Sequence, residues 1–177
     1  ILKEGLQNDW ENKEKIADLL LFETTTKSAG EKTCFADYVE NMAEGQEEIL
    51  YLAGENRAAI ENAPYLEAFK AEGKEVLLMI DPIDDFVIPQ LMEYKGKKLK
   101  AVNKGELDDD KDALKEEEAQ FEGLIGFAKE LLSGVKEVKL TTRLKDSASC
   151  LVGDEYSMSP HIEEMMRRMG QDVPPRE

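Results

Sequence analysis

Three closely spaced aspartates come nearest to a pattern that could perform acid–base chemistry. Asp81, Asp84 and Asp85 stand at the start of a stretch with helical spacing, and neighbouring carboxylates can exchange protons with a substrate. Aspartates at a helix start also cap its free backbone N–H groups. The single histidine, His161, cannot be placed beside a nucleophile from the sequence. We therefore interpret these aspartates as capping and solvated residues, and we predict no catalytic site.

Other catalytic and metal-binding patterns are missing from the sequence. It contains no P-loop, no GxGxxG after an apolar run, no GxSxG, no HExxH and no EF-hand loop. Its two cysteines, Cys34 and Cys150, are far apart and lack CxxC spacing, which is typical of free thiols in a reducing compartment. One histidine and no cysteine cluster leave too few of the usual zinc ligands. We expect no metal and no cofactor in this chain.

A methionine-rich stripe near the carboxyl end could instead bind polypeptides. Ser159 and Pro160 suit a helix start, Gly170 suits its end, and the apolar residues between them share one face at helical spacing: Met158, Ile162, Met165, Met166 and Met169. Methionine is flexible and polarizable, so such a face can adapt to many apolar partners. Most apolar stripes on helices are buried. Both interpretations, core and binding surface, fit the residues.

The elements that must position these residues centre on a β-α-β unit within residues 47–94. Ile49 to Ala53 and Val76 to Ile80 are short, uniformly apolar runs typical of strands covered on both faces. Helical spacing between them ends at Gly73. A second helix is predicted after Asp81, with Pro89 at its end. Parallel strands joined in this way form an α/β layer structure.

The flanking segments predict helices and a further core. One helix is expected over residues 2–22 and a second one around residues 35–42, and Trp10 and Tyr51 are interpreted as packing residues. A hairpin or third strand is expected around the turn at residues 95–97. An acidic stretch, 106–118, precedes a helix over residues 121–132. Short apolar runs at 135–140 and 150–152 predict two more strands.

Composition excludes several classes of protein. The 177 residues are 41% hydrophobic and carry a net charge of −16, which suits one or two folded domains and argues against binding to nucleic acid or to anionic membranes. No apolar run approaches the roughly 20 residues that a membrane helix needs. Because the chain begins at Ile1 and ends on Pro174-Pro175-Arg176-Glu177, we expect an excised fragment.

Several motifs resemble the heat-shock protein 90 chaperone family, above all its bacterial branch. The resemblance covers nearly the whole chain and rests on these stretches: Asp37-Tyr38-Val39, Glu44-Gly45-Gln46, Pro64-Tyr65-Leu66-Glu67, Gly73-Lys74-Glu75-Val76-Leu77, Asp81-Pro82-Ile83-Asp84-Asp85-Phe86 and Arg143-Leu144. Asn41 departs from the arginine common in the family. The resemblance implies a mixed α/β (α+β) chain with three parts: a helical connector of the middle region (1–46), a small αβα subdomain (47–106) and an incomplete α+β C-terminal domain (107–177).

The resemblance also implies a function. The family hydrolyses ATP with Mg²⁺ in an N-terminal domain upstream of Ile1, so this piece would hold no nucleotide and would not hydrolyse ATP itself. It would supply surface for partly folded client proteins in a cytoplasmic homodimer whose dimerising helices lie beyond Glu177; the fragment alone would be a monomer. The client-binding positions would be Asp85, Phe86, Met158, Ile162, Met165 and Met166, with Pro89 departing from the pattern. Two alternatives stay open: an acidic interaction domain for a basic partner, and a small α/β enzyme without a recognised motif.

Overall fold

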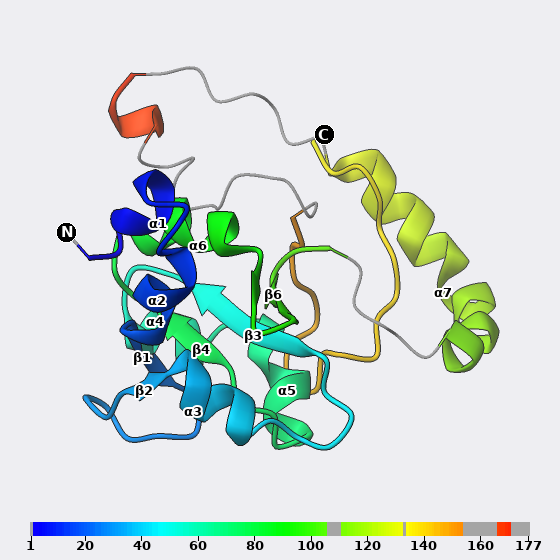
Figure 1. Cartoon of the computed structure of the whole chain (residues 1–177). Helices are drawn as coiled ribbons and strands as arrows, with labels where there is room; N and C mark the ends of the chain where they lie inside the picture. Colours follow the sequence, from blue (N-terminus) through cyan, green and yellow to red (C-terminus); the bar gives the residue numbers. More distant parts are fainter. Residues whose placement is uncertain (1, 106–110, 133, 154–165, 171–177) are drawn as a thin grey trace.

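The fold is built on one six-stranded mixed sheet with the strand order β2-β1-β4-β3-β6-β5. The computed structural model describes residues 2–105, 111–132, 134–153 and 166–170. Helices cover both faces of this sheet, and helix α7 lies to one side of it (Figure 1). The mixed α+β class expected from the sequence is confirmed.

The predicted β-α-β unit forms the centre of the sheet. Strand β3 (Glu48–Ala53) runs parallel to β4 (Leu77–Met79), with Leu52 opposite Leu78. Helix α4 (Arg57–Glu61), the 3₁₀ turn η1 (Pro64–Leu66) and helix α5 (Glu67–Ala71) make the crossover. All three residues of β4 are buried, which explains why its sequence is apolar without alternation.

The amino-terminal segment differs from the single helix expected over residues 2–22. Helix α1 (Gly5–Asn8) ends early, and helix α2 (Lys13–Asp18) starts after a turn in which the Asp9 carboxylate accepts hydrogen bonds from Asn12. Strand β1 (Leu21–Thr24) then pairs antiparallel with β4, and strand β2 (Thr33–Cys34) pairs with β1. Helix α3 (Phe35–Glu40) follows. The prediction of one long helix was wrong because local capping and strand pairing divide it.

The predicted hairpin after α6 is confirmed. Helix α6 spans Asp84–Leu91, strand β5 Glu93–Tyr94 and strand β6 Lys97–Ala101. Strands β5 and β6 pair antiparallel around Lys95 and Gly96, which both have positive φ angles, 48° and 75°. Two such residues are typical of a tight hairpin turn. Strand β6 also lies parallel to β3, so the hairpin extends the sheet.

The two faces of the sheet carry separate apolar cores. Alternate residues of β3 and β4 point to opposite sides, as strands require. Ile49 and Met79 pack with side chains from α1, α2, α3 and α6, whereas Leu52 and Leu78 pack with those from α4, η1 and α5. The result is a three-layer unit that fixes the position of α6.

Beyond β6 the chain forms α7 away from this unit and then returns to it at residues 145–153. Helix α7 (Lys111–Leu131) confirms the helix predicted over residues 121–132. The strands predicted at residues 135–140 and 150–152 were wrong: in the described residues this segment has no strand, only an isolated bridge between Lys104 and Gly153. Residues 135, 138 and 140 are only half-buried, so they lack the packing that would favour a strand.

Candidate functional site

At the start of α6, two of the three aspartates, Asp81 and Asp84, bond to the backbone of the turn that leads into the helix. The backbone N–H of Asp84 donates to the carbonyl of Asp81 at 2.8 Å. The Asp81 carboxylate accepts from the N–H of Ile83 at 3.3 Å, and the Asp84 carboxylate accepts from the N–H of Asp81 at 3.3 Å. These bonds satisfy backbone donors at the helix start. The carboxylates of Asp81 and Asp84 therefore bond backbone groups of the turn before α6, as capping residues do, although no side chain caps the helix at Ile83 itself. The expectation of solvated aspartates was wrong for Asp84, which is buried.

Asp84 also ties α6 to the amino-terminal segment. Its side chain is buried, and the ammonium of Lys3 lies 2.5 Å from its carboxylate and 3.4 Å from that of Asp81. Burial raises the pKa of Asp84, and the hydrogen bond and charge of Lys3 oppose that rise. This buried pair fixes α6 against α1.

Phe86 is the large apolar residue of α6 whose side chain is exposed to solvent. Its side chain is 38% exposed, whereas the next two residues, Val87 and Ile88, are fully buried. Asp85 beside it is half-buried. Pro89 is exposed too, and it lies inside α6 rather than at its end. The predicted helix stop at Pro89 was therefore wrong, since the helix continues to Leu91.

A small cavity lies behind this surface. Asp85, Pro89, Tyr51 and Lys104 line it together with Ala53, Ala101 and Asn103, and its volume is about 20 Å³. That space accommodates about one water molecule. Burial raises the pKa of Tyr51 to about 12, with the charge of Asp85 adding to the rise, and burial lowers the pKa of Lys104 while Asp85 opposes it. The alternative of a small enzyme gains no substrate-sized cavity near Asp81 to Asp85.

Trp10 is an exposed aromatic residue that the sequence did not reveal. It was interpreted as a packing residue, but 69% of it is exposed. The ammonium of Lys13 lies 4.5 Å from its ring centroid, and Lys13 also donates a hydrogen bond to the carbonyl of Gln90 in α6. The helix break between Asn8 and Lys13 removes Trp10 from any helical face, and no pattern in the sequence marked that break. Tyr51, by contrast, packs against the core as predicted.

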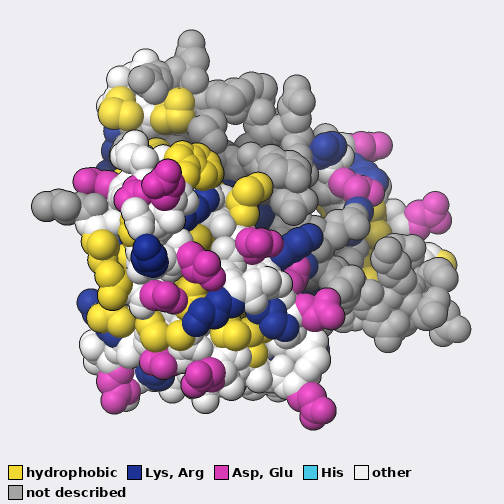
Figure 2. Space-filling model, in the orientation of Figure 1, with side chains coloured by type: hydrophobic (Ala, Val, Ile, Leu, Met, Phe, Trp, Pro, Cys, Tyr) yellow, Lys and Arg dark blue, Asp and Glu magenta, His cyan; other side chains and the backbone are white. Residues whose placement is uncertain are grey.

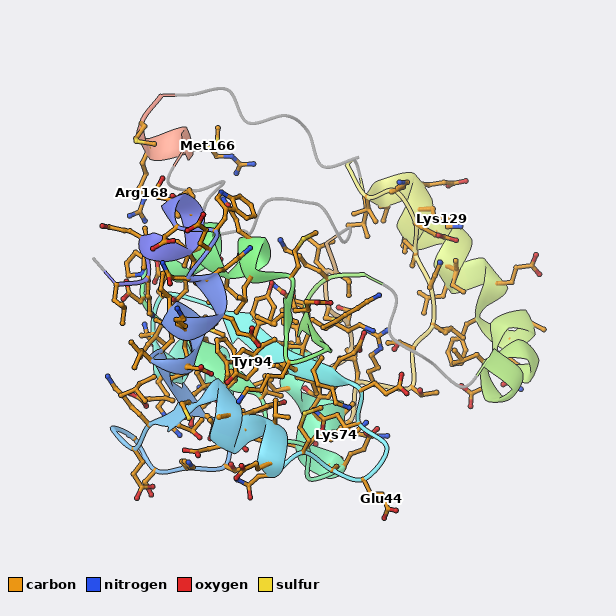
Figure 3. The ribbon with its side chains drawn as sticks, viewed as in Figure 1. Glu44, Lys74, Tyr94, Lys129, Met166 and Arg168 are labelled. Carbon is orange, nitrogen blue, oxygen red and sulfur yellow. The ribbon has the colours of Figure 1, made fainter. Side chains whose placement is uncertain are left out.

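The methionine-rich stripe is described only in part. Met158, Ile162 and Met165 lie outside the described residues. Met166 is half-buried at the start of a helical turn, in which the N–H of Met169 donates to the Met166 carbonyl at 3.1 Å, and Met169 is 60% exposed (Figure 3). The choice between core and binding surface stays open for this stripe.

Helix α7 presents a second apolar stripe to solvent. The apolar face predicted for this helix is mostly exposed rather than covered. Ile125 and Ala128 are half-buried, and the exposed residues of the stripe, with Phe127 added and Leu132 just past the end of α7, are Phe121, Leu124, Phe127, Leu131 and Leu132. Single exposed apolar residues are common on proteins, but a stripe of them such as that on α7 is not.

On the sheet unit, by contrast, apolar side chains alternate with acidic and basic ones across the face shown in Figure 2.

A second cavity among the described residues is lined by polar groups that bond to one another. It measures about 290 Å³ and is lined by Thr26, Tyr38, Asn41, Met42, Ala43, Gln46, Gly73, Lys74 and Glu75. The Tyr38 hydroxyl donates to the Glu75 carbonyl at 2.7 Å and accepts from Gln46 at 3.1 Å, and Thr26 donates to the Glu75 carboxylate. Within the described ranges no cluster of three or more histidine, cysteine or acidic residues suits a metal ion. No described helix is long and apolar enough to span a membrane.

Known proteins resemble the chain over almost its whole length. It matches the family model for the Hsp90 protein over residues 1–173. The chaperone protein HtpG of Geobacter sulfurreducens is 46% identical over 183 aligned positions, and that of Streptomyces coelicolor is 45% identical over 182. Each alignment covers 98% of this chain, and the chain spans 28% of the length of either relative.

A solved structure shows the same fold. The middle domain of a putative heat shock protein from Plasmodium falciparum superposes with a TM-score of 0.55 at 42% sequence identity. The match covers 59% of this chain and 43% of that one.

Proposed function

Because the chain belongs to the Hsp90 family, we propose that it supplies client-binding surface to an ATP-dependent chaperone that binds and remodels partly folded proteins. The observation that carries this proposal is the exposure of the Phe86 ring on α6, a helix whose buried face is fixed against the sheet by Val87, Ile88 and Leu91. An apolar ring presented by a rigid element can bind another polypeptide with little loss of conformational entropy. Asp85 beside it adds a charge that would favour client segments carrying a basic residue.

A second client-binding surface is proposed on the methionine-rich stripe. Met158, Ile162, Met165 and Met166 would line it, and the exposure of Met169 on the same predicted face supports it. Two separate apolar surfaces would hold a client more tightly than either surface alone, because the second contact forms at a high effective concentration.

The proposal also covers the longer protein. Residues 1–46 would belong to the connector of a middle domain, 47–106 to its small subdomain, and 107–177 to the start of a C-terminal domain. An N-terminal domain would bind ATP and Mg²⁺, and helices beyond residue 177 would join two copies of the protein in the cytoplasm. The chain itself would perform no ATP hydrolysis.

The test replaces Phe86 by alanine in the full-length chaperone that carries this chain. Loss of an anchoring aromatic at a binding surface commonly costs more than about 1 kcal/mol, so we expect client affinity to fall about fivefold or more. Fluorescence anisotropy with a labelled, permanently unfolded protein measures this. Because Phe86 is 38% exposed and otherwise packed on the chain, the midpoint of thermal unfolding should fall modestly, and affinities are compared well below that midpoint.

Two comparison variants are made, Leu19→Ala as the control, because Leu19 is 65% exposed outside every proposed client-binding surface, and Phe127→Ala. Phe127 is also an exposed phenylalanine, but it lies on the apolar stripe of α7, so equal losses of client affinity in Phe86→Ala and Phe127→Ala would assign client binding to exposed apolar surface in general and not to α6. Equal affinity of the Phe86→Ala variant and the unmodified protein would refute the proposal. A steep loss of binding with added salt, the same in every variant, would favour the acidic interaction domain instead.

A further inference from the structure

The carboxylate of Glu67 accepts hydrogen bonds from the backbone of a loop that is distant in sequence, residues 145–147. One Glu67 oxygen accepts hydrogen bonds from three successive N–H groups, those of Lys145 at 2.6 Å, Asp146 at 2.9 Å and Ser147 at 3.2 Å. The other oxygen accepts from the Ser147 hydroxyl. Successive N–H groups turned toward one point form an anion-binding nest, and bonds to a charged acceptor are the stronger kind.

The same segment is attached at a second place. The Gly105 N–H donates to the Gly153 carbonyl at 3.0 Å, and the Gly153 N–H donates to the Asn103 carbonyl at 3.1 Å. The Tyr65 hydroxyl donates to the Leu151 carbonyl at 2.5 Å. Residues 145–153, called the strap below, are thus bound to the α5 side of the sheet unit and to the chain that leaves β6.

Polar contacts rather than apolar burial hold the strap. Leu151 is 49% exposed and Val152 is 39% exposed, so its large apolar side chains contribute little hydrophobic stabilisation. A hydrogen bond made in water replaces one with solvent, and its net contribution is modest. The closed strap is therefore close in free energy to an open one. The Glu67 carboxylate accepts the most hydrogen bonds from the strap, so it decides whether the closed or the open form is favoured.

We propose that residues 145–153 form a releasable strap held closed by the Glu67 carboxylate, and that release detaches the carboxyl-terminal side of α7 from the sheet unit. The chain leaves this unit at Gly105, forms α7, and returns to it through the strap (Figure 1). While the strap is closed, α7 is tethered at both ends. Once the strap opens, only the tether at Gly105 remains.

The Glu67 carboxylate stays charged around neutral pH. The Ser147 hydroxyl and the backbone N–H groups hold the pKa of Glu67 well below its usual range, at about 2. The strap should therefore respond to a change of residue or to a competing contact rather than to mild acid.

Amide hydrogen exchange of the 177-residue chain tests the strap. In Glu67→Ala we expect exchange at Lys145, Asp146 and Ser147 to accelerate about tenfold, as the loss of several charge-assisted hydrogen bonds at an exposed site implies. Gly153 should follow, and Leu78 in the central strand should not change. Glu72→Ala is the matched control, because Glu72 lies at the end of the same helix and pairs only locally, with Lys74 at 2.7 Å.

A double-mutant cycle separates the strap from a general effect on α5. Ser147→Ala leaves the helix untouched and should accelerate exchange of the strap by itself, but it should add nothing to Glu67→Ala, because the two side chains act through one contact. Unchanged exchange at residues 145–147 in Glu67→Ala would overturn the proposal. If that variant accelerates exchange at Leu78 as well, an unaltered strap in Ser147→Ala would overturn it.

Discussion

The buried carboxyl of Asp84 decides how α6 is held. It is the one aspartate of the three that is fully buried, and Lys3 is its cationic partner. A buried charge left without a partner costs far more than the pair itself contributes. The main role of Lys3 is therefore to prevent the Asp84 carboxylate from being buried without a cationic partner, and the stability gained from the ion pair itself is smaller.

Lys3→Ala should destabilise the chain by about 2–4 kcal/mol, somewhat below the usual cost of breaking a buried pair because Lys3 is partly exposed. Burial already raises the pKa of Asp84 above 3.8, and removal of Lys3 should raise it further. A raised native pKa contributes stability that is present below 3.8 and is lost as pH rises through the native value. The deficit of the variant should therefore shrink in acid.

Urea unfolding at neutral and mildly acidic pH measures both effects. Lys15→Ala is the control, because Lys15 is exposed and bonds only to Asn12 nearby. A deficit that is the same at both pH values would contradict the role given to Asp84.

The candidate site was predictable from sequence only where side chains act locally. Asp81 and Asp84 bond to backbone N–H groups of the turn before α6, close to the capping role that residue preferences suggest. The exposure of Trp10 was not predictable, because it depends on a helix break created by the Asp9 carboxylate. The contact of Glu67 with residues 145–147 was not predictable either, since it joins segments far apart in the chain.

Among the elements, the β5–β6 hairpin requires glycine in its turn, whereas α7 contains a glycine that its helical backbone does not require. Gly96 has φ 75° in the hairpin turn, a conformation that other residues adopt with strain. Gly123 lies inside α7, and an added methyl group there would meet no atom within 4 Å.

Gly96→Ala should destabilise the chain by about 1–2 kcal/mol, the cost of a left-handed backbone conformation. Gly123→Ala should stabilise α7 by about 0.5–1 kcal/mol, since alanine loses less entropy in a helix. Circular dichroism during thermal unfolding measures the helical content and midpoint of each. A destabilised Gly123→Ala variant would mean that the exposed side of α7 is covered in solution.

Elements with an uninterrupted pattern were predicted correctly. Strands β3 and β4 are apolar because both faces of the sheet are covered, and α7 shows its period over several turns. Strands β1 and β2 were missed because their pairing partners lie elsewhere in the sequence. The runs at 135–140 and 150–152 looked like strands but lack a partner among the described residues.

At the scale of the whole molecule, stability is unevenly distributed. The sheet unit has a core on each face, whereas the apolar residues of α7 from Phe121 onward are largely exposed. Helices without tertiary packing are only marginally stable in water. The molecule therefore combines a cooperative unit with a segment that opens independently.

Hydrogen exchange over the full chain should show these two levels. Amides of β3 and β4 should exchange at least about a thousandfold more slowly than those of α7, because only the former require global unfolding, which costs about 5 kcal/mol or more. Mass spectrometry of peptic fragments gives the comparison. Similar protection in α7 and the sheet would show that another surface packs on α7.

The two hydrogen bonds that join Gly153 to Asn103 and Gly105 have one more consequence. Two backbone positions that bond to each other lie close enough for a few residues to connect them. Everything between them, α7 included, is arranged like an insertion into a simpler architecture. An engineer could replace that excursion with a short loop, or with a reporter domain, while keeping the strand order of the sheet intact.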